Sequence, residues 1–199
     1  MKVALGFKAH SGWAASIVLA ADQNSLQILD RRRVELAHDQ WERQPYHAAE
    51  QLEPQAAQKL VERGVRSANK YATREVKAAI KRMESTGHKV VTCAVLTGAA
   101  MPDWSVDEIL AVHFRMHKAE GVLFREALVE AAFACGLRVT PVPEKSLMEW
   151  AVKALKKSEN DLMNEIVGLG KRFGPPWGKD QKEATLAAMI ALSQMSDEL

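Results

Sequence analysis

Residues 89–143 contain the pattern that determines the fold class of this chain. The stretch opens with KVVTCAVLTG (residues 89–98), a continuous apolar run rich in β-branched residues that ends at Thr97-Gly98. Such a run is typical of a strand that is buried on both faces. A long helical pattern follows, and LRVTPV (residues 137–142) then indicates a second short strand. A crossover of this length lets the second strand return parallel to the first, which predicts a right-handed βαβ unit.

The composition fits one globular domain. The chain has 199 residues, of which 47% are apolar, and its 27 basic and 25 acidic residues nearly cancel. We expect one domain over residues 1–199, with a C-terminal helical layer from about residue 144. Cys93 and Cys135 fit neither a disulfide framework nor a zinc site and are predicted to be small core residues. No signal-like segment develops before Lys8 and no apolar run is long enough to span a membrane, so we expect a cytoplasmic protein without membrane contact.

Three strands in a meander are predicted before the first helix. Val3, Leu5 and Phe7 alternate with Lys2, Ala4 and Gly6, which predicts the first strand, and residues 13–21 are an apolar second strand. Residues 22–25 are typical of a hairpin turn and lead into a third strand over residues 26–37. We expect the third strand to place six residues on one face: Leu26, Ile28, Asp30, Arg32, Val34 and Leu36. By the same alternation Arg32 points away from Arg31 and Arg33, and the triplet suits an exposed edge strand.

A long helix is predicted over residues 55–85, after an irregular link over residues 38–54 that is broken by Pro45 and Pro54. Its core face repeats at helical spacing: Val61, Val65, Ala68, Ala72, Val76, Ala79 and Met83. A basic stripe lies on roughly the opposite face: Lys59, Arg63, Arg66, Lys70, Arg74, Lys77 and Lys81. The stripe suits phosphate groups along a nucleic acid, although a charge run is also typical of a solvated helix face.

The second half of the chain is predicted to form helices before and after the short strand at residues 137–142. A capping box at residues 105–108 begins a helix that is predicted to run to about Ala134 with a bend near Gly121. Further helices are predicted over residues 146–157, 161–168 and 180–195. Residues 173–178 form a rigid loop whose Trp177 could stack on a base, dock a partner or cover an edge of the core.

Three short motifs, in chain order, are similar to those of the RuvC-type Holliday-junction resolvases. Residues 5–11, LGFKAHS, resemble the first strand of that family, which ends in a glycine, an apolar residue and an aspartate. Residues 118–122 resemble the helix after its fourth strand, and residues 180–187 resemble its closing acidic helix. The resemblance implies an α/β fold of the ribonuclease H-like class. That fold has a five-stranded mixed sheet, made of a three-strand antiparallel meander and two parallel strands, with helices on both faces.

The set of metal-binding carboxylates that the resemblance implies is incomplete in this sequence. Such nucleases hold two divalent cations with about four carboxylates. Here Lys8 stands at the first-strand aspartate position, residues 90–98 contain no acid, and only Asp180 and Glu183 remain as candidate metal ligands. Two exposed carboxylates bind magnesium poorly, and the Lys8 ammonium would take the place of the metal. We therefore expect no cofactor, with Mg²⁺ or Mn²⁺ as the alternative if Asp30 or Asp103 completes the set.

Two further groups of residues could bind ligands. Lys8, His10 and Ser11 form a turn at the end of a central strand, where an anion could bind, but a catalytic His–Ser pair would need a third group. His113, His117 and Glu120 share one helical face with zinc-capable atoms. Zinc needs further ligands, so we interpret these three as a polar border of the core stripe at Ile109, Met116 and Leu123.

The leading hypothesis is a catalytically degenerate resolvase relative that binds structured DNA or RNA, or a protein partner, without cleaving. In it Asp180 and Glu183 are relics that pair with Lys8. The alternatives are a divergent metal-dependent nuclease and a protein-interaction module. An exposed edge strand is also compatible with a homodimer.

Overall fold

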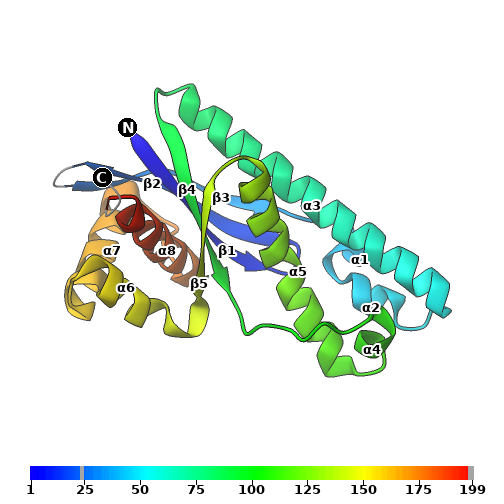
Figure 1. The fold of residues 1–199 in the computed structure, drawn as a ribbon. Helices are drawn as coiled ribbons and strands as arrows, with labels where there is room; N and C mark the ends of the chain where they lie inside the picture. The colour runs from blue at the N-terminus through cyan, green and yellow to red at the C-terminus, as the bar shows by residue number, and fades with distance from the viewer. Residues whose placement is uncertain (23–24, 197–199) are drawn as a thin grey trace.

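Five strands form one mixed sheet in the computed structural model, which describes residues 1–22 and 25–196 (Figure 1). The strand order is β3-β2-β1-β4-β5, with β1–β2 and β2–β3 antiparallel and β1–β4 and β4–β5 parallel. The bounds are β1 Lys2–His10, β2 Trp13–Asp22, β3 Ser25–Glu35, β4 Lys89–Thr97 and β5 Arg138–Pro143. This is the predicted meander followed by a parallel βαβ unit. The centre of the predicted hairpin, residues 23–24, lies outside the described residues.

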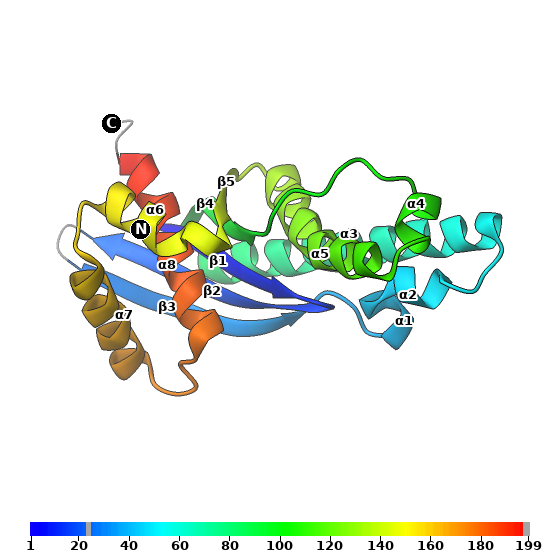
Figure 2. The ribbon, with the colours of Figure 1, turned by 90° about the horizontal axis from the view of Figure 1, so that it is seen from below.

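Helices cover both faces of the sheet, as Figures 1 and 2 show. One face packs against α3 (Pro54–Glu84) and α5 (His113–Ala134). The other packs against α8 (Lys179–Ser196), with α6 (Leu147–Leu155) and α7 (Glu159–Phe173) beside it. Because β1 and β4 are covered on both faces, neither strand alternates between buried and exposed residues. The sequence predicted this for β4, whereas the alternation that it predicted for β1 is wrong.

The core face of α3 is confirmed. Six of its seven predicted members are buried and the seventh, Val65, is partly buried against the same core. The two cysteines are also as predicted, because both are free, with Cys93 buried in β4 and Cys135 partly buried. Burial raises the pKa of the Cys93 thiol, which keeps it protonated and unreactive.

The link over residues 38–54 is not irregular, which corrects the sequence prediction. It contains α1 (Gln40–Arg43) and α2 (Pro45–Ala49). Pro45 begins α2 and Pro54 begins α3, because a proline lacks only an amide that the first helical turn does not use. Pro45 packs directly on Gly64 of α3, where an added Cβ would lie 2.5 Å from the proline Cβ.

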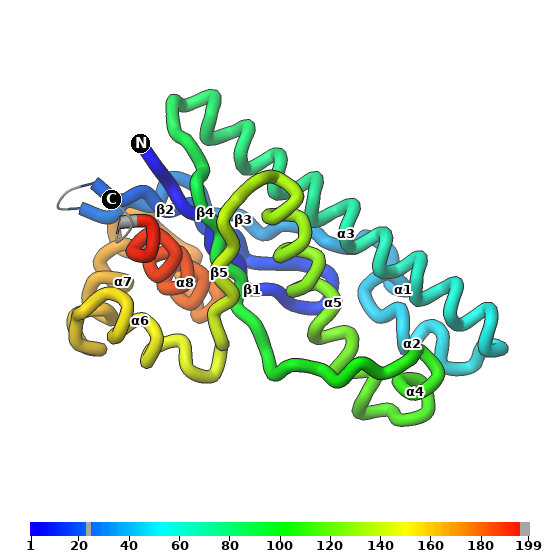
Figure 3. Tube along the Cα trace, in the orientation of Figure 1, coloured from blue at the N-terminus to red at the C-terminus, as the bar shows by residue number. Residues whose placement is uncertain are grey.

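The helix predicted from Ser105 to Ala134 is two helices. The Ser105–Glu108 capping box begins α4 (Val106–Leu110) as expected, but the chain then breaks at Val112, which has extended backbone angles (φ −139°, ψ 112°). Gly121 lies inside α5 and does not interrupt it. The break lets Ile109 of α4 pack with α2 and α3 in a small separate core, at the end of α3 where α1, α2 and α4 gather (Figure 3).

Strand β3 contains a bulge that the alternation rule missed. Val18 of β2 pairs with Asp30 and Leu19 pairs with Ile28, so Leu29 is an extra residue. One extra residue moves the side chains that follow to the other face. Ile28 therefore packs on the α8 side and Val34 on the α3 side, rather than on one face. Arg32 still points away from Arg31 and Arg33, and β3 is an edge strand, as predicted.

The C-terminal helices differ modestly from the predicted bounds. A short 3-10 turn over Glu144–Ser146 precedes α6, α7 is longer than predicted at both ends, and α8 extends to Ser196. No helix in the described ranges 1–22 and 25–196 is long and apolar enough to cross a membrane.

Candidate functional site

A buried lysine lies at the carboxyl end of the central strand β1. Lys8 is 5% exposed, and its ammonium group contacts Glu144 and Glu183, the latter at 3.0 Å. Glu144 follows directly after β5, and Glu183 lies on the first turns of α8. The predicted pairing of Lys8 with the closing helix thus exists for Glu183, whereas Asp180 lies beside His10 instead.

Gly6 brings the closing helix to this position. Alternation along β1 places Gly6 and Lys8 on the same face of the sheet. A Cβ added to Gly6 would lie 2.0 Å from the carbonyl oxygen of Ala184, one residue after Glu183. Because α8 crosses β1 at backbone contact distance, the carboxylates on its first turns come within reach of Lys8. The glycine in the first-strand motif is therefore required by packing.

Each carboxylate that contacts Lys8 has a second cationic neighbour. Glu144 also pairs with Arg125 of α5 at 3.2 Å, and Glu183 lies 3.6 Å from Lys179. Burial raises the pKa of Glu144, but the hydrogen bond from Lys8 and the positive charges of Lys8, Arg125 and Lys179 outweigh it. The pKa of Glu144 therefore lies below its ordinary value and the group is ionised at neutral pH.

His10 has a different set of neighbours. Its ring stacks on Trp13 with centroids 4.3 Å apart, and the Arg33 guanidinium covers the Trp13 ring at 3.8 Å. His10 Nε2 lies 3.1 Å from an Asp180 oxygen, an ion-pair distance, although the ring N–H is not aligned for a hydrogen bond. Ser11 is exposed and lines a hollow with residues of the α1 segment. His10 and Ser11 are therefore not brought together as a catalytic pair.

The residues around Lys8 do not fit the two-cation arrangement that the resemblance implies. Two divalent cations need several carboxylates with uncompensated charge. Glu144 and Glu183 already share a buried ammonium, which repels a metal ion at the same place. Asp30 does not complete the set, because it pairs with Arg32 at 2.8 Å and with Arg82 of α3 at 3.1 Å. Asp103 is exposed in the loop before α4.

The basic stripe on α3 is exposed along its whole length. All seven cations are exposed, and Lys59 and Lys81 are separated by ~33 Å along the helix at 1.5 Å per residue. Arg66 pairs with Glu62 at 3.7 Å and Arg74 with Glu75 at 2.9 Å, while Arg63 lies over the Trp41 ring at 4.6 Å. Within residues 1–22 and 25–196, the four lysines of the stripe have no ion-pair partner.

The stripe and Lys8 lie on opposite faces of the sheet. Helix α3 packs on one face through its apolar side, so its basic side points away from the sheet. Helix α8 and the Lys8 site lie on the other face, as Figure 2 shows for the two helices. The sequence predictions of a degenerate site and of a phosphate-binding surface therefore concern two separate regions.

No protein-family model and no curated protein matches the sequence. Among solved structures, a Thermus thermophilus RuvC structure aligns with a TM-score of 0.56 at 13% identity, covering 98% of this chain and 96% of that one. A T. thermophilus RuvC in complex with Holliday junction substrate aligns with a TM-score of 0.56 at 14% identity, covering 100% and 97%. The chain has the ribonuclease H-like fold of the RuvC-type resolvases. At this identity the likeness concerns the fold.

Within this RuvC-type fold, sequence reasoning missed Glu144. A usable signal was present, because Glu144 directly follows the second parallel strand, and the carboxyl ends of parallel strands meet at one edge of a sheet. No sequence pattern predicted that Arg125, or the stack of Arg33, Trp13 and His10, would lie at the site. They come from distant segments that only the folded chain brings together.

The proline loop is a packing element. The Trp177 ring lies against Gly170 of α7, and its Nε1–H donates to the Ile166 carbonyl at 3.1 Å. Arg31 of β3 donates to the carbonyls of Gly174 and Pro175 at 2.7 and 2.9 Å. Trp177 is thus held against the core edge, the last of the three roles that the sequence left open.

Of the three α5 residues predicted to form a polar border of the core, two are exposed and one is buried. His113 and His117 are exposed, but Glu120 is 2% exposed, so its carboxylate is buried. It accepts hydrogen bonds from the ring and the backbone of His47 in α2. The three histidines lie together, which no local pattern indicated.

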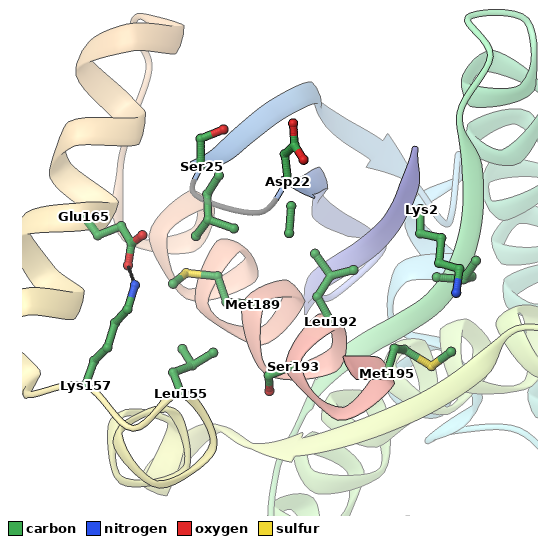
Figure 4. A pocket seen from close by; sticks show the side chains of 13 residues that line it. Lys2, Asp22, Ser25, Leu155, Lys157, Glu165, Met189, Leu192, Ser193 and Met195 are labelled. Carbon is green, nitrogen blue, oxygen red and sulfur yellow. Dashed lines mark hydrogen bonds and ion pairs between the residues drawn. The ribbon is translucent and has the colours of Figure 1, made fainter. Parts of the chain in front are cut away.

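A separate hollow lies at the other end of β1, near Lys2 (Figure 4). Met189, Leu192 and Met195 of α8 line it, and Lys157 pairs with Glu165 there at 2.7 Å. None of the side chains that the sequence marked as functional lies in this hollow.

Proposed function

We propose that this chain is a catalytically degenerate relative of the RuvC-type resolvases that binds structured nucleic acid without cleaving it. The observation that carries the proposal is the basic stripe on α3. Its cations are exposed, evenly spaced and held on one rigid helix, and its four lysines are not neutralised by neighbouring carboxylates in the described residues. A ~33 Å row of cations matches the spacing of phosphates over about one turn of a duplex.

Three further observations support the proposal, and the first of them argues against cleavage. The Lys8 ammonium holds two of the three carboxylates at the end of β1, where a nuclease of this type would need free acids for metal ions. One of the aligned RuvC structures was solved with Holliday junction substrate, so a fold of this kind accommodates branched DNA. Arg63 over Trp41 adds an aromatic surface beside the stripe that could stack on a base.

The test is fluorescence anisotropy of a labelled four-way junction, a DNA duplex and an RNA duplex, at low and moderate salt and with or without manganese. A gel is run on the same samples. We expect salt-dependent binding and no cleavage, because phosphate contacts release counterions while the Lys8 site offers no free acid cluster. Manganese-dependent cleavage would overturn the degenerate assignment, and absence of binding at low salt would overturn the proposal.

A matched pair of charge reversals locates the surface. Lys70→Glu/Lys77→Glu alters two exposed, unpaired positions of the stripe, whereas Lys153→Glu/Lys171→Glu makes the same charge change on α6 and α7. We expect the stripe variant to weaken binding by at least about 10-fold at low salt and to reduce the salt slope by about 2. An equal effect of the control variant would assign the binding to net charge rather than to α3.

A further inference from the structure

Three histidines from two separate segments meet at the end of the molecule where α1, α2 and α4 gather. His47 lies on α2, and His113 and His117 lie one turn apart at the start of α5. Their ring centroids are 4.5 to 5.1 Å apart, and one nitrogen of each ring lies within 4.8 Å of the others. Imidazole nitrogens gathered in this way are ligands for zinc and neighbouring transition metals.

Glu120 orients His47 toward the centre of this cluster. Its buried carboxylate accepts a hydrogen bond from His47 Nδ1 at 2.8 Å and from the His47 backbone N–H at 3.2 Å. Because a carboxylate accepts, Nδ1 carries the proton and Nε2 carries the free electron pair. His47 Nε2 is buried and has no hydrogen-bond partner among the described residues. A carboxylate behind a histidine is the usual outer support of a metal-binding imidazole.

The distances suit a metal ion. A tetrahedral zinc ion with nitrogens at 2.0–2.1 Å places its ligand atoms about 3.3 Å apart. His113 Nε2 and His117 Nε2 are 3.1 Å apart, and the three ligand nitrogens all lie within 4.8 Å of one another. His113 and His117 are exposed, so the site opens to solvent and leaves a fourth position for water. A Glu50 oxygen lies 4.0 Å from His113 Nδ1, which adds a negative charge near the cluster.

We propose that His47, His113 and His117 bind one Zn²⁺ ion, with Glu120 as the residue that positions His47. The ion links α2 to α5 and so fixes the short helices to the rest of the molecule. The proposal does not rest on the proposed nucleic-acid binding, because neither the stripe nor Lys8 contributes a ligand.

The test is calorimetric titration of ZnCl₂ into chelator-treated protein from which any affinity tag has been removed. We expect one zinc ion per chain, and visible absorption of tetrahedral cobalt when Co²⁺ replaces it. His117→Gln and His113→Gln alter exposed residues, so both variants are expected to fold, as a circular dichroism spectrum would verify. Each should weaken zinc binding by at least about 100-fold, and Glu120→Gln by about 10- to 100-fold.

His88→Gln is the matched control, because His88 lies outside the cluster, directly before β4. It should bind zinc like the unaltered protein, and zinc should raise the melting temperature of both. Absence of zinc binding in the unaltered protein would overturn the proposal. Equal zinc affinity in His88→Gln and His117→Gln would also overturn it.

Discussion

At the scale of single residues, Lys8 defines the chemistry of the candidate site. A buried ammonium between two carboxylates is held by charge in a setting with little water. Removing Lys8 leaves two partly exposed carboxylates with only Arg125 and Lys179 as cationic neighbours, which is more damaging than the loss of an exposed ion pair. The lysine therefore has a structural role that an aspartate at this position could not fill.

Two substitutions at Lys8 test this role. Lys8→Ala should lower the free energy of unfolding by about 2–3 kcal/mol, less than for a fully buried pair because Glu144 and Glu183 are partly exposed. Lys8→Asp should lower it further without metal, since it adds a third acid to Glu144 and Glu183, and Mn²⁺ should then raise the melting temperature. The measurement is thermal unfolding with and without MnCl₂, with Lys153→Asp on the exposed face of α6 as control. An unchanged melting temperature for Lys8→Ala would show that the ion pairs do not stabilise the fold.

At the scale of elements, the contact between α8 and β1 positions the site. Helix α8 packs across β1, β2 and β4 and carries the two residues that meet Lys8 and His10. The close crossing at Gly6 fixes how far along β1 the helix begins. Similarly, the contact of Pro45 with Gly64 fixes α2 against α3 and so places His47 near α5.

Gly6→Ala tests the crossing of α8 over β1. The added methyl group would meet a backbone carbonyl that cannot rotate away, so α8 must shift and the free energy of unfolding should fall by about 2 kcal/mol or more. Gly121→Ala is the control, because an added Cβ there meets nothing within 4 Å and alanine favours the helix interior, with an expected gain of about 0.5–1 kcal/mol. Urea unfolding measures both. Equal stability of the unaltered protein and Gly6→Ala would contradict the close crossing.

At the scale of the whole molecule, carboxylates in three regions link stability to pH. The pKa values of Glu42, Glu108 and Glu144 lie below the ordinary value of 4.5. Burial raises the pKa of Glu42, but backbone hydrogen bonds from His38 and Asp39 and one from Ser67 outweigh it. Hydrogen bonds at the α4 cap lower the pKa of Glu108. Glu126 has the opposite shift, because burial raises its pKa.

The sign of the pH dependence follows from these directions. A carboxyl with a lower pKa in the folded state stabilises it fully above pH 4.5, and the effect is lost as the pH falls through the folded pKa. We therefore expect stability to fall on acidification below about pH 4.5. Glu144→Gln should make this fall shallower, whereas Glu149→Gln on exposed α6 should leave it unchanged. The urea concentration at the unfolding midpoint, measured between pH 7 and pH 3, reports this loss of stability. An identical dependence of the midpoint on pH in both variants would contradict a stabilising role of Glu144.

Features that depend on a local pattern could be predicted from the amino-acid sequence alone. Apolar runs and helical periodicity predicted the strands, their parallel and antiparallel pairing, and both the core face and the basic face of α3. The same reading identified Lys8 at the position where the resemblance implies an acid. These features are set by residues close together in the chain, so a short window contains the information.

The tertiary structure decided which distant residues share a site. Glu144 joins Lys8 and Glu183 only because β5 and α8 end beside β1, and His47 joins His113 and His117 only because α2 packs on α3 and α5. The bulge at Leu29 likewise depends on how β3 pairs with β2. Such contacts arise from packing between elements far apart in the chain, where a shift of one residue or one turn changes the neighbours without changing the local pattern.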